Sequence, residues 1–243
     1  MKVLRLAPFL LCATFLAMMA PAQTIQVSKE NRTIAITATD KVIVLADIAT
    51  LHIGFIAYGP DSDSAYAAGS HTSNAIIKAL TTAGVPNDSI ESENQNVSPV
   101  QEYQIDKLTP AEKAQRKFQV TQSWTVRTNA DDAAKVLDVA VKAGANQSGQ
   151  IDWSLKDENS SQSEAASKAL QRARTVAAEM AKSLNTNLGA LLYASNETQA
   201  EPPSPVVMRA MPAARTAQKV EPLAINPRRI EKTATVYAVF AIE

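Results

Sequence analysis

The sequence predicts an α+β fold in which helices pack against an antiparallel sheet. Residues 48–58 and 118–128 alternate between apolar and polar side chains, as half-buried strands do. Residues 65–83 and 161–186 instead repeat apolar side chains at helical spacing. Over residues 48–156 the order is strand–helix–strand–strand–helix–strand, which is typical of the ferredoxin-like βαββαβ arrangement. We therefore expect one sheet and one core, extended by a long third helix and two C-terminal strands.

Residues 1–22 predict a secretory signal peptide. Lys2 and Arg5 precede a short apolar run, and the small residues that end at Ala22 form a cleavage site. The run of about 15 residues is shorter than the roughly 20 that span a membrane, so a permanent anchor is not expected. No other run approaches this length, so the mature chain is expected to lack a transmembrane span. The only cysteine, Cys12, lies in this leader, which leaves the mature protein without a disulfide.

The first elements of the mature chain are strands. Residues 33–39 alternate as a short strand, and residues 42–46 are either a second short strand or a turn into the next one. The strand at 48–58 is the clearest, with its apolar side chains on one face. The helix at 65–83 is expected to end at Gly84, since glycine is the usual residue after a helix.

The central elements begin with an unusually polar strand at residues 90–103. Its asparagine and glutamine content indicates a sheet edge or a solvated face. The charged residues 104–116 predict a loop, and the strong strand at 118–128 follows it. Asn129 is expected to cap the next helix, which ends at Gly144.

The longest helix is expected over residues 161–186. Ser161 and Glu164 have the spacing of a capping box, which predicts that the helix begins there. Its expected apolar stripe consists of Ala166, Ala169, Leu170, Ala173, Val176, Ala177, Met180 and Leu184. Because alanine dominates this stripe, close packing against a sheet or another helix is expected.

The remaining strands are predicted at residues 151–155, 188–195 and 233–242. Residues 197–231 hold six of the twelve prolines and keep no apolar period, which indicates a long mobile loop. A regular strand follows this loop and needs a sheet to pair with. We therefore expect residues 23–243 to form a single domain that includes the loop.

Few residues have side chains in patterns that indicate catalysis or ligand binding. His52 and His71 lack a recognisable nucleophile pattern around them, so ordinary packing or solvation is the simpler interpretation. No His-x-x-x-His pair or thiolate indicates a metal site, and capping of the following helix explains Asp61 and Asp63. No glycine cluster predicts phosphate binding. We therefore predict no catalytic, cofactor-binding or metal-binding residue, no cofactor and no enzymatic activity.

The charge of the mature chain excludes one class of partner. Removal of the leader leaves a net charge near −2, without any basic block. Nucleic-acid binding is therefore not expected, because it relies on concentrated positive charge.

Several stretches of the sequence resemble the SIMPL-domain family, also called the DUF541 or YggE-like family. They are Asp47-Ile48-Ala49-Thr50-Leu51, Ala83-Gly84-Val85 before Asp88-Ser89-Ile90, Val97-Ser98-Pro99-Val100, and Gly144-Ala145-Asn146-Gln147. The alanine-rich helix and the late loop with proline and methionine also match, so the resemblance covers about residues 32–243. One departure is Ala46, where the family often has proline.

The resemblance implies a periplasmic or cell-envelope protein with no assigned enzymatic activity. Some relatives look like ring- or channel-shaped oligomers, and some are linked to oxidative-stress defence. We therefore expect a homo-oligomer, or a protein with a partner in the cell envelope, that acts through surface contacts in oxidative or envelope stress. The expected interaction surface comprises Asn94 and Asn96 on the polar strand and Met208, Arg209 and Met211 in the loop.

Two alternatives stay open. The first is a scavenger of small molecules or metals that uses Met208 and Met211, because exposed thioethers oxidise readily and bind soft metals. The second is a secreted hydrolase that uses His71 with a nearby serine.

Overall fold

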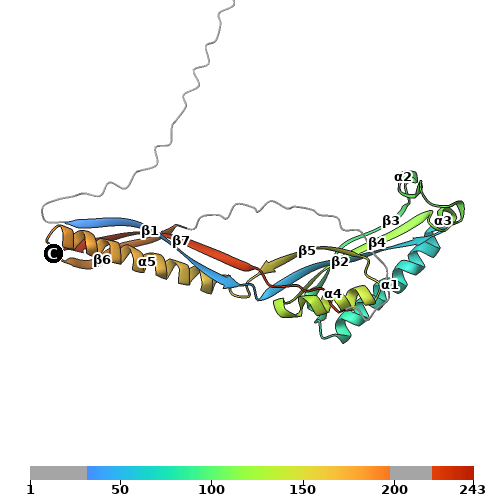
Figure 1. The fold of residues 1–243 in the computed structure, drawn as a ribbon, viewed down its shortest axis with the longest axis horizontal. Helices are drawn as coiled ribbons and strands as arrows, with labels where there is room; N and C mark the ends of the chain where they lie inside the picture. Colours follow the sequence, from blue (N-terminus) through green and yellow to red (C-terminus); the bar gives the residue numbers. More distant parts are fainter. Residues whose placement is uncertain (1–31, 198–220) are drawn as a thin grey trace, which may run out of the picture.

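The computed structural model describes residues 32–197 and 221–243. The predicted signal peptide and the centre of the proline-rich loop lie outside these residues. The described part contains five α-helices and two antiparallel sheets, which lie end to end along the long axis of the molecule (Figure 1). The predicted α+β class is confirmed. None of the described helices is long and apolar enough to cross a membrane.

The first sheet has four strands in the order β3-β4-β2-β5. Its strands are β2 (Ile48–Gly59), β3 (Ile90–Pro99), β4 (Phe118–Asn129) and β5 (Gln147–Ser154). Its helices are α1 (Ser62–Thr82) and α4 (Ala133–Lys142), with the short α2 (Glu102–Ile105) and α3 (Pro110–Gln115) between β3 and β4. This order and its connections are compatible with the predicted ferredoxin-like arrangement.

The core of this sheet lies between its strands and the helices α1 and α4. Leu51, Ile53 and Phe55 of β2 are each 1% exposed, as the alternation of residues 48–58 predicts. The Phe55 ring packs 5.9 Å, centroid to centroid, from the ring of Trp124 in β4. The N-terminus of α1 is capped by Asp61, whose Oδ1 accepts a hydrogen bond from the Ser64 amide at 2.7 Å.

The second sheet has three strands in the order β1-β7-β6, with one long helix against it. These elements are β1 (Thr33–Leu45), β6 (Leu188–Glu197), β7 (Arg229–Ile242) and α5 (Glu158–Ser183). The α5 side chains that contact the sheet recur every four residues and are small: Ser161, Ala165, Ala169, Ala173, Ala177 and Ala181. They pack over β1 and β7, where Ile36, Ala238 and Phe240 belong to the same buried cluster. Small side chains let the helix axis approach the sheet closely.

Asp47 joins the two sheets. It lies in the two-residue link between β1 and β2, and its Oδ1 accepts a hydrogen bond from the Lys156 amide at 2.7 Å. Its carbonyl oxygen accepts from the Ala130 amide at 2.9 Å. Beside it, the Ala46 amide donates to the Arg228 carbonyl at 2.8 Å. These bonds tie the ends of β4, β5 and β7 to the point where the chain passes from one sheet to the other.

The expectation of one sheet with one core is wrong. The described residues instead form two sheets with separate buried clusters, because β1, β6 and β7 pair with one another and not with the βαββαβ unit. The division into a leader, residues 1–22, and a single domain, residues 23–243, stays a prediction.

Several predicted boundaries also differ from the structure. Residues 33–45 form one continuous strand, since all thirteen pair with β7. The polar strand ends at Pro99, and α2 follows. The predicted loop 197–231 is shorter on both sides: β6 includes Glu197, and β7 begins at Arg229.

One helix start is wrong, and another helix lacks the side-chain bond expected from its cap. Helix α5 begins at Glu158 with Asp157 as its cap, whose side chain accepts from the Ser160 amide at 2.9 Å. The supposed capping residue Ser161 is instead 8% exposed inside the helix. Asn129 makes no bond from its side chain to the helix backbone and donates to Asp132 Oδ2 at 3.2 Å.

The apolar stripe of α5 is shifted by one residue from the predicted one at several positions. Val176, Met180 and Leu184 are 41%, 44% and 60% exposed, whereas Ala165 and Ala181 are buried. The larger side chains do not fit beneath a helix that lies this close to its sheet, so they occupy the flank.

Candidate functional site

The most distinctive polar surface is the face of the four-stranded sheet that α1 and α4 do not cover. We call it the open face. The alternation of β2 places Thr50 and His52 on it, opposite the buried Leu51 and Ile53. The strand register extends it to β3, β4 and β5, with Glu91, Asn94, Asn96, Thr121, Ser123, Thr125, Arg127 and Asp152.

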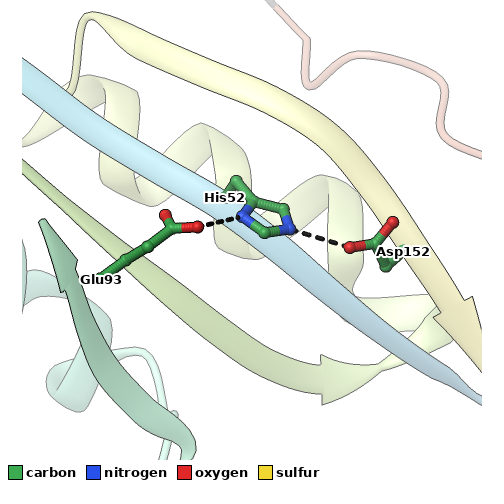
Figure 2. A network of polar contacts seen from close by, with 3 residues as sticks. All are labelled: His52, Glu93 and Asp152. Atoms are coloured by element: carbon green, nitrogen blue, oxygen red, sulfur yellow. Dashed lines mark hydrogen bonds and ion pairs between the residues drawn. The ribbon is translucent and has the colours of Figure 1, made fainter. Parts of the chain in front are cut away.

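A hydrogen-bonded cluster lies at the centre of the open face (Figure 2). His52 Nδ1 lies 3.1 Å from Glu93 Oε1, and His52 Nε2 lies 2.9 Å from Asp152 Oδ2. The three side chains come from β2, β3 and β5, and the histidine side chain is 30% exposed. The two carboxylates approach opposite edges of the ring, as Figure 2 shows.

Irregularities in both edge strands build this cluster. The β3–β4 register shifts between Ser92 and Asn94, so Glu93 is the extra residue of a β-bulge. The β2–β5 register shifts between Leu51 and Ile53, directly at His52. A bulge changes the direction in which a side chain points, which is how Glu93 reaches His52 across the intervening strand β4.

Gly149 allows β5 to pass close to His52. A Cβ atom built on Gly149 would lie 3.1 Å from the Cβ of His52, so a larger residue would press against the imidazole side chain. The approach of the β5 bulge to the ring therefore depends on glycine at this position.

The surroundings of His52 favour its charged form. The hydrogen bond that His52 donates to Asp152 is the largest cause, the contacts with Glu93 add to it, and partial burial opposes both. The balance raises the pKa of His52 above its ordinary value of 6.5.

The same geometry argues against nucleophilic catalysis at this histidine. A general base needs a free ring nitrogen within reach of a hydroxyl or thiol. Both nitrogens of His52 face carboxylate oxygens instead. In the part of the chain that the structure describes, no group of three or more His, Cys, Asp or Glu side chains has an arrangement that could hold a metal ion.

An open cavity of about 670 Å³ adjoins the cluster along β2 and β4. Thr50, Glu91 and Thr125 line it on the side nearest His52, and Arg127 and Lys156 bring positive charge to it. Its lining carries both signs of charge, so it selects neither anions nor cations by charge alone.

The structure describes only some of the residues predicted to form an interaction surface. Asn94 and Asn96 are exposed on β3, which is an edge strand as expected, and Asn96 Nδ2 donates to Ser98 Oγ at 3.3 Å. Met208, Arg209 and Met211 lie outside the described residues. Whether any of these residues binds a partner stays a prediction.

The sequence pattern does not indicate the partners of His52. Strand alternation places the histidine on the polar face correctly. Glu93 lies two strands away from it in the sheet, and Asp152 lies 100 positions away in the chain. The polar, glycine-containing start of β5 was the only signal of an irregular strand there.

Comparisons with known proteins match most of this chain. The family model SIMPL, described as a protein of unknown function (DUF541), matches residues 34–240. Two curated relatives are the 26 kDa periplasmic immunogenic proteins of Brucella melitensis and Brucella abortus. Each is 26% identical over 186 residues, which cover 76% of this chain and 74% of the relative.

Proposed function

The chain belongs to the SIMPL (DUF541) family, and from this premise we propose that it is an exported periplasmic protein that acts through self-assembly and not through catalysis. The location is supported by the relatives, which are named as periplasmic, and by the signal peptide predicted over residues 1–22.

The free side of edge strand β3 carries the proposal. Within the described residues β3 pairs only with β4, so its outer side offers backbone donors and acceptors to another strand. Past the bulge at Glu93 the strand is regular, and residues 94–98 are uncharged. Natural edges are usually protected by lysine, proline or a bulge, and this segment has none of these before Pro99. A second chain can therefore extend the sheet here by β-augmentation.

A groove beside this edge supports the same proposal. A depression of about 450 Å³ lies between α1 and the strands β3 and β4, lined by Tyr66, Asn96 and Val97 among others. Tyr66 and Val97 are 63% and 43% exposed. An added strand would place alternate side chains toward this groove, which gives them apolar surface to bury.

Mass measurement of the mature chain, residues 23–243, tests the proposal. Light scattering after gel filtration at about micromolar concentration should give a multiple of the monomer mass. The Asn96→Lys variant should shift the mass toward the monomer, because a lysine on the edge disfavours strand addition. Asn159→Lys makes the same change at an exposed position of α5 and should leave the assembly intact. A monomeric wild-type protein would contradict self-assembly.

A role in oxidative or envelope stress remains a prediction from the family resemblance. The scavenger alternative depends on Met208 and Met211, which lie outside the described residues. The hydrolase alternative has His71 exposed on α1, and no structural contact favours it.

A further inference from the structure

We propose that His52, Glu93 and Asp152 form a proton-operated clasp, which ties the two edge strands of the four-stranded sheet to its interior and opens when His52 loses a proton. The clasp is a property of the folded chain and does not depend on self-assembly.

The count of ring protons is the first step. A neutral imidazole has one N–H donor and one lone pair, whereas the imidazolium ion has two donors. An ionised carboxylate only accepts hydrogen bonds. The contacts of 3.1 Å to Glu93 and 2.9 Å to Asp152 therefore both form only when His52 carries two ring protons. After loss of one proton, one carboxylate faces a lone pair and is repelled.

The charges around the ring favour the closed state. On the open face β3 contributes Glu91 and Glu93, and β5 contributes Asp152. Strand β4 lies directly beside His52 and places the neutral Thr125 opposite the histidine. It contributes one positive charge to this face, Arg127, two residues further along the strand. Two bonded carboxylates outweigh this single, exposed guanidinium, so the site stabilises a second ring proton.

The position of the clasp lets it hold both edge strands of the sheet. In the order β3-β4-β2-β5, the strands β3 and β5 are the two edges, and His52 lies on β2 between them. Both carboxylates come from edge strands, and both edge strands are irregular near the histidine. A bulge interrupts the backbone ladder, so a side-chain bond contributes more to holding the strand there. Protonation of one residue thus fixes both edges at once.

Hydrogen exchange of the mature chain tests the clasp. After correction for intrinsic rates, a change from pH 6 to pH 8 should reduce amide protection in residues 90–97 and 147–152. For partly exposed charge pairs the expected change is at most about fivefold for each pair. The strands β1 and β7 of the other sheet serve as the internal reference and should keep their protection. An equal change in amide protection in both sheets between pH 6 and pH 8 would overturn the proposal.

Matched variants separate the clasp from a general effect of pH. In the Glu93→Gln/Asp152→Asn double variant the difference between pH 6 and pH 8 should disappear, while β1 and β7 show that the protein is folded. Glu91→Gln removes a carboxylate from the same face that is not bonded to His52, and should retain the wild-type response. If Glu91→Gln abolishes the response as well, the effect comes from the overall field and not from the clasp.

The protonation state is measured directly by nitrogen-15 NMR of the imidazole ring. At pH 6 both ring nitrogens of His52 should carry a proton, and the double variant should titrate at lower pH than the wild type. A single neutral tautomer at pH 6 would refute the clasp.

Discussion

Replacement of Ala173 by leucine should destabilise the protein through α5. Ala173 is 0% exposed and lies in the middle of the row of small residues that faces β1 and β7. A leucine adds three carbon atoms where the helix backbone lies against the sheet, so either the helix moves away or side chains leave their rotamers. Overpacking of this kind costs about 1–3 kcal/mol.

Urea unfolding followed by far-ultraviolet circular dichroism measures this cost, because Trp124 and Trp153 both lie in the other sheet. With a denaturant slope of about 1–3 kcal/mol/M, the midpoint should fall by about 1 M. Ala178→Leu makes the same change on the exposed side of α5 and should alter the stability by less than about 0.5 kcal/mol. Equal midpoints for the two variants would show that α5 does not pack through this row.

Three further substitutions test other parts of the structure. Phe55→Ala should cost about 3–5 kcal/mol in urea unfolding and shift the fluorescence of Trp124, because it leaves a cavity beside that ring. Gly69→Val should cost about 1–3 kcal/mol in the same assay, since even a Cβ there would lie 2.8 Å from Val120 Cγ1. The folded state raises the pKa of His52, so its stabilising contribution is full below pH 6.5 and is lost as the pH rises through the raised pKa. The unfolding free energy of His52→Gln should therefore fall less between pH 6 and pH 8 than that of the wild type, and parallel curves would contradict this.

Local patterns predict much of the four-stranded sheet. The alternation in 48–58 and 118–128 identifies β2 and β4 and the faces that they bury. Gly84 and Gly144 have φ angles of +98° and +119°, which explains why both mark the ends of helices. These features depend on near neighbours in the chain, so the sequence displays them directly.

The row of small residues in α5 shows where a local pattern fails. Alanine occurs on several sides of this helix, so hydrophobicity does not show which side faces the sheet. The structure chooses Ala165 and Ala181 over Met180 and Leu184, because the distance to the sheet admits only small side chains. That distance is a property of the packed helix and sheet and is not encoded in the period of the sequence.

By itself the sequence determined the α+β class, the family, the polar character of β3 and the side of β2 on which His52 lies. Only the tertiary structure decided that the strands divide between two sheets and that Glu93 and Asp152 meet His52. The physical reason is that strand partners and bulges are set by backbone hydrogen bonds between distant segments. A bulge shifts side chains by one position relative to the neighbouring strand, and a strand's own alternation records nothing about which strand will lie beside it.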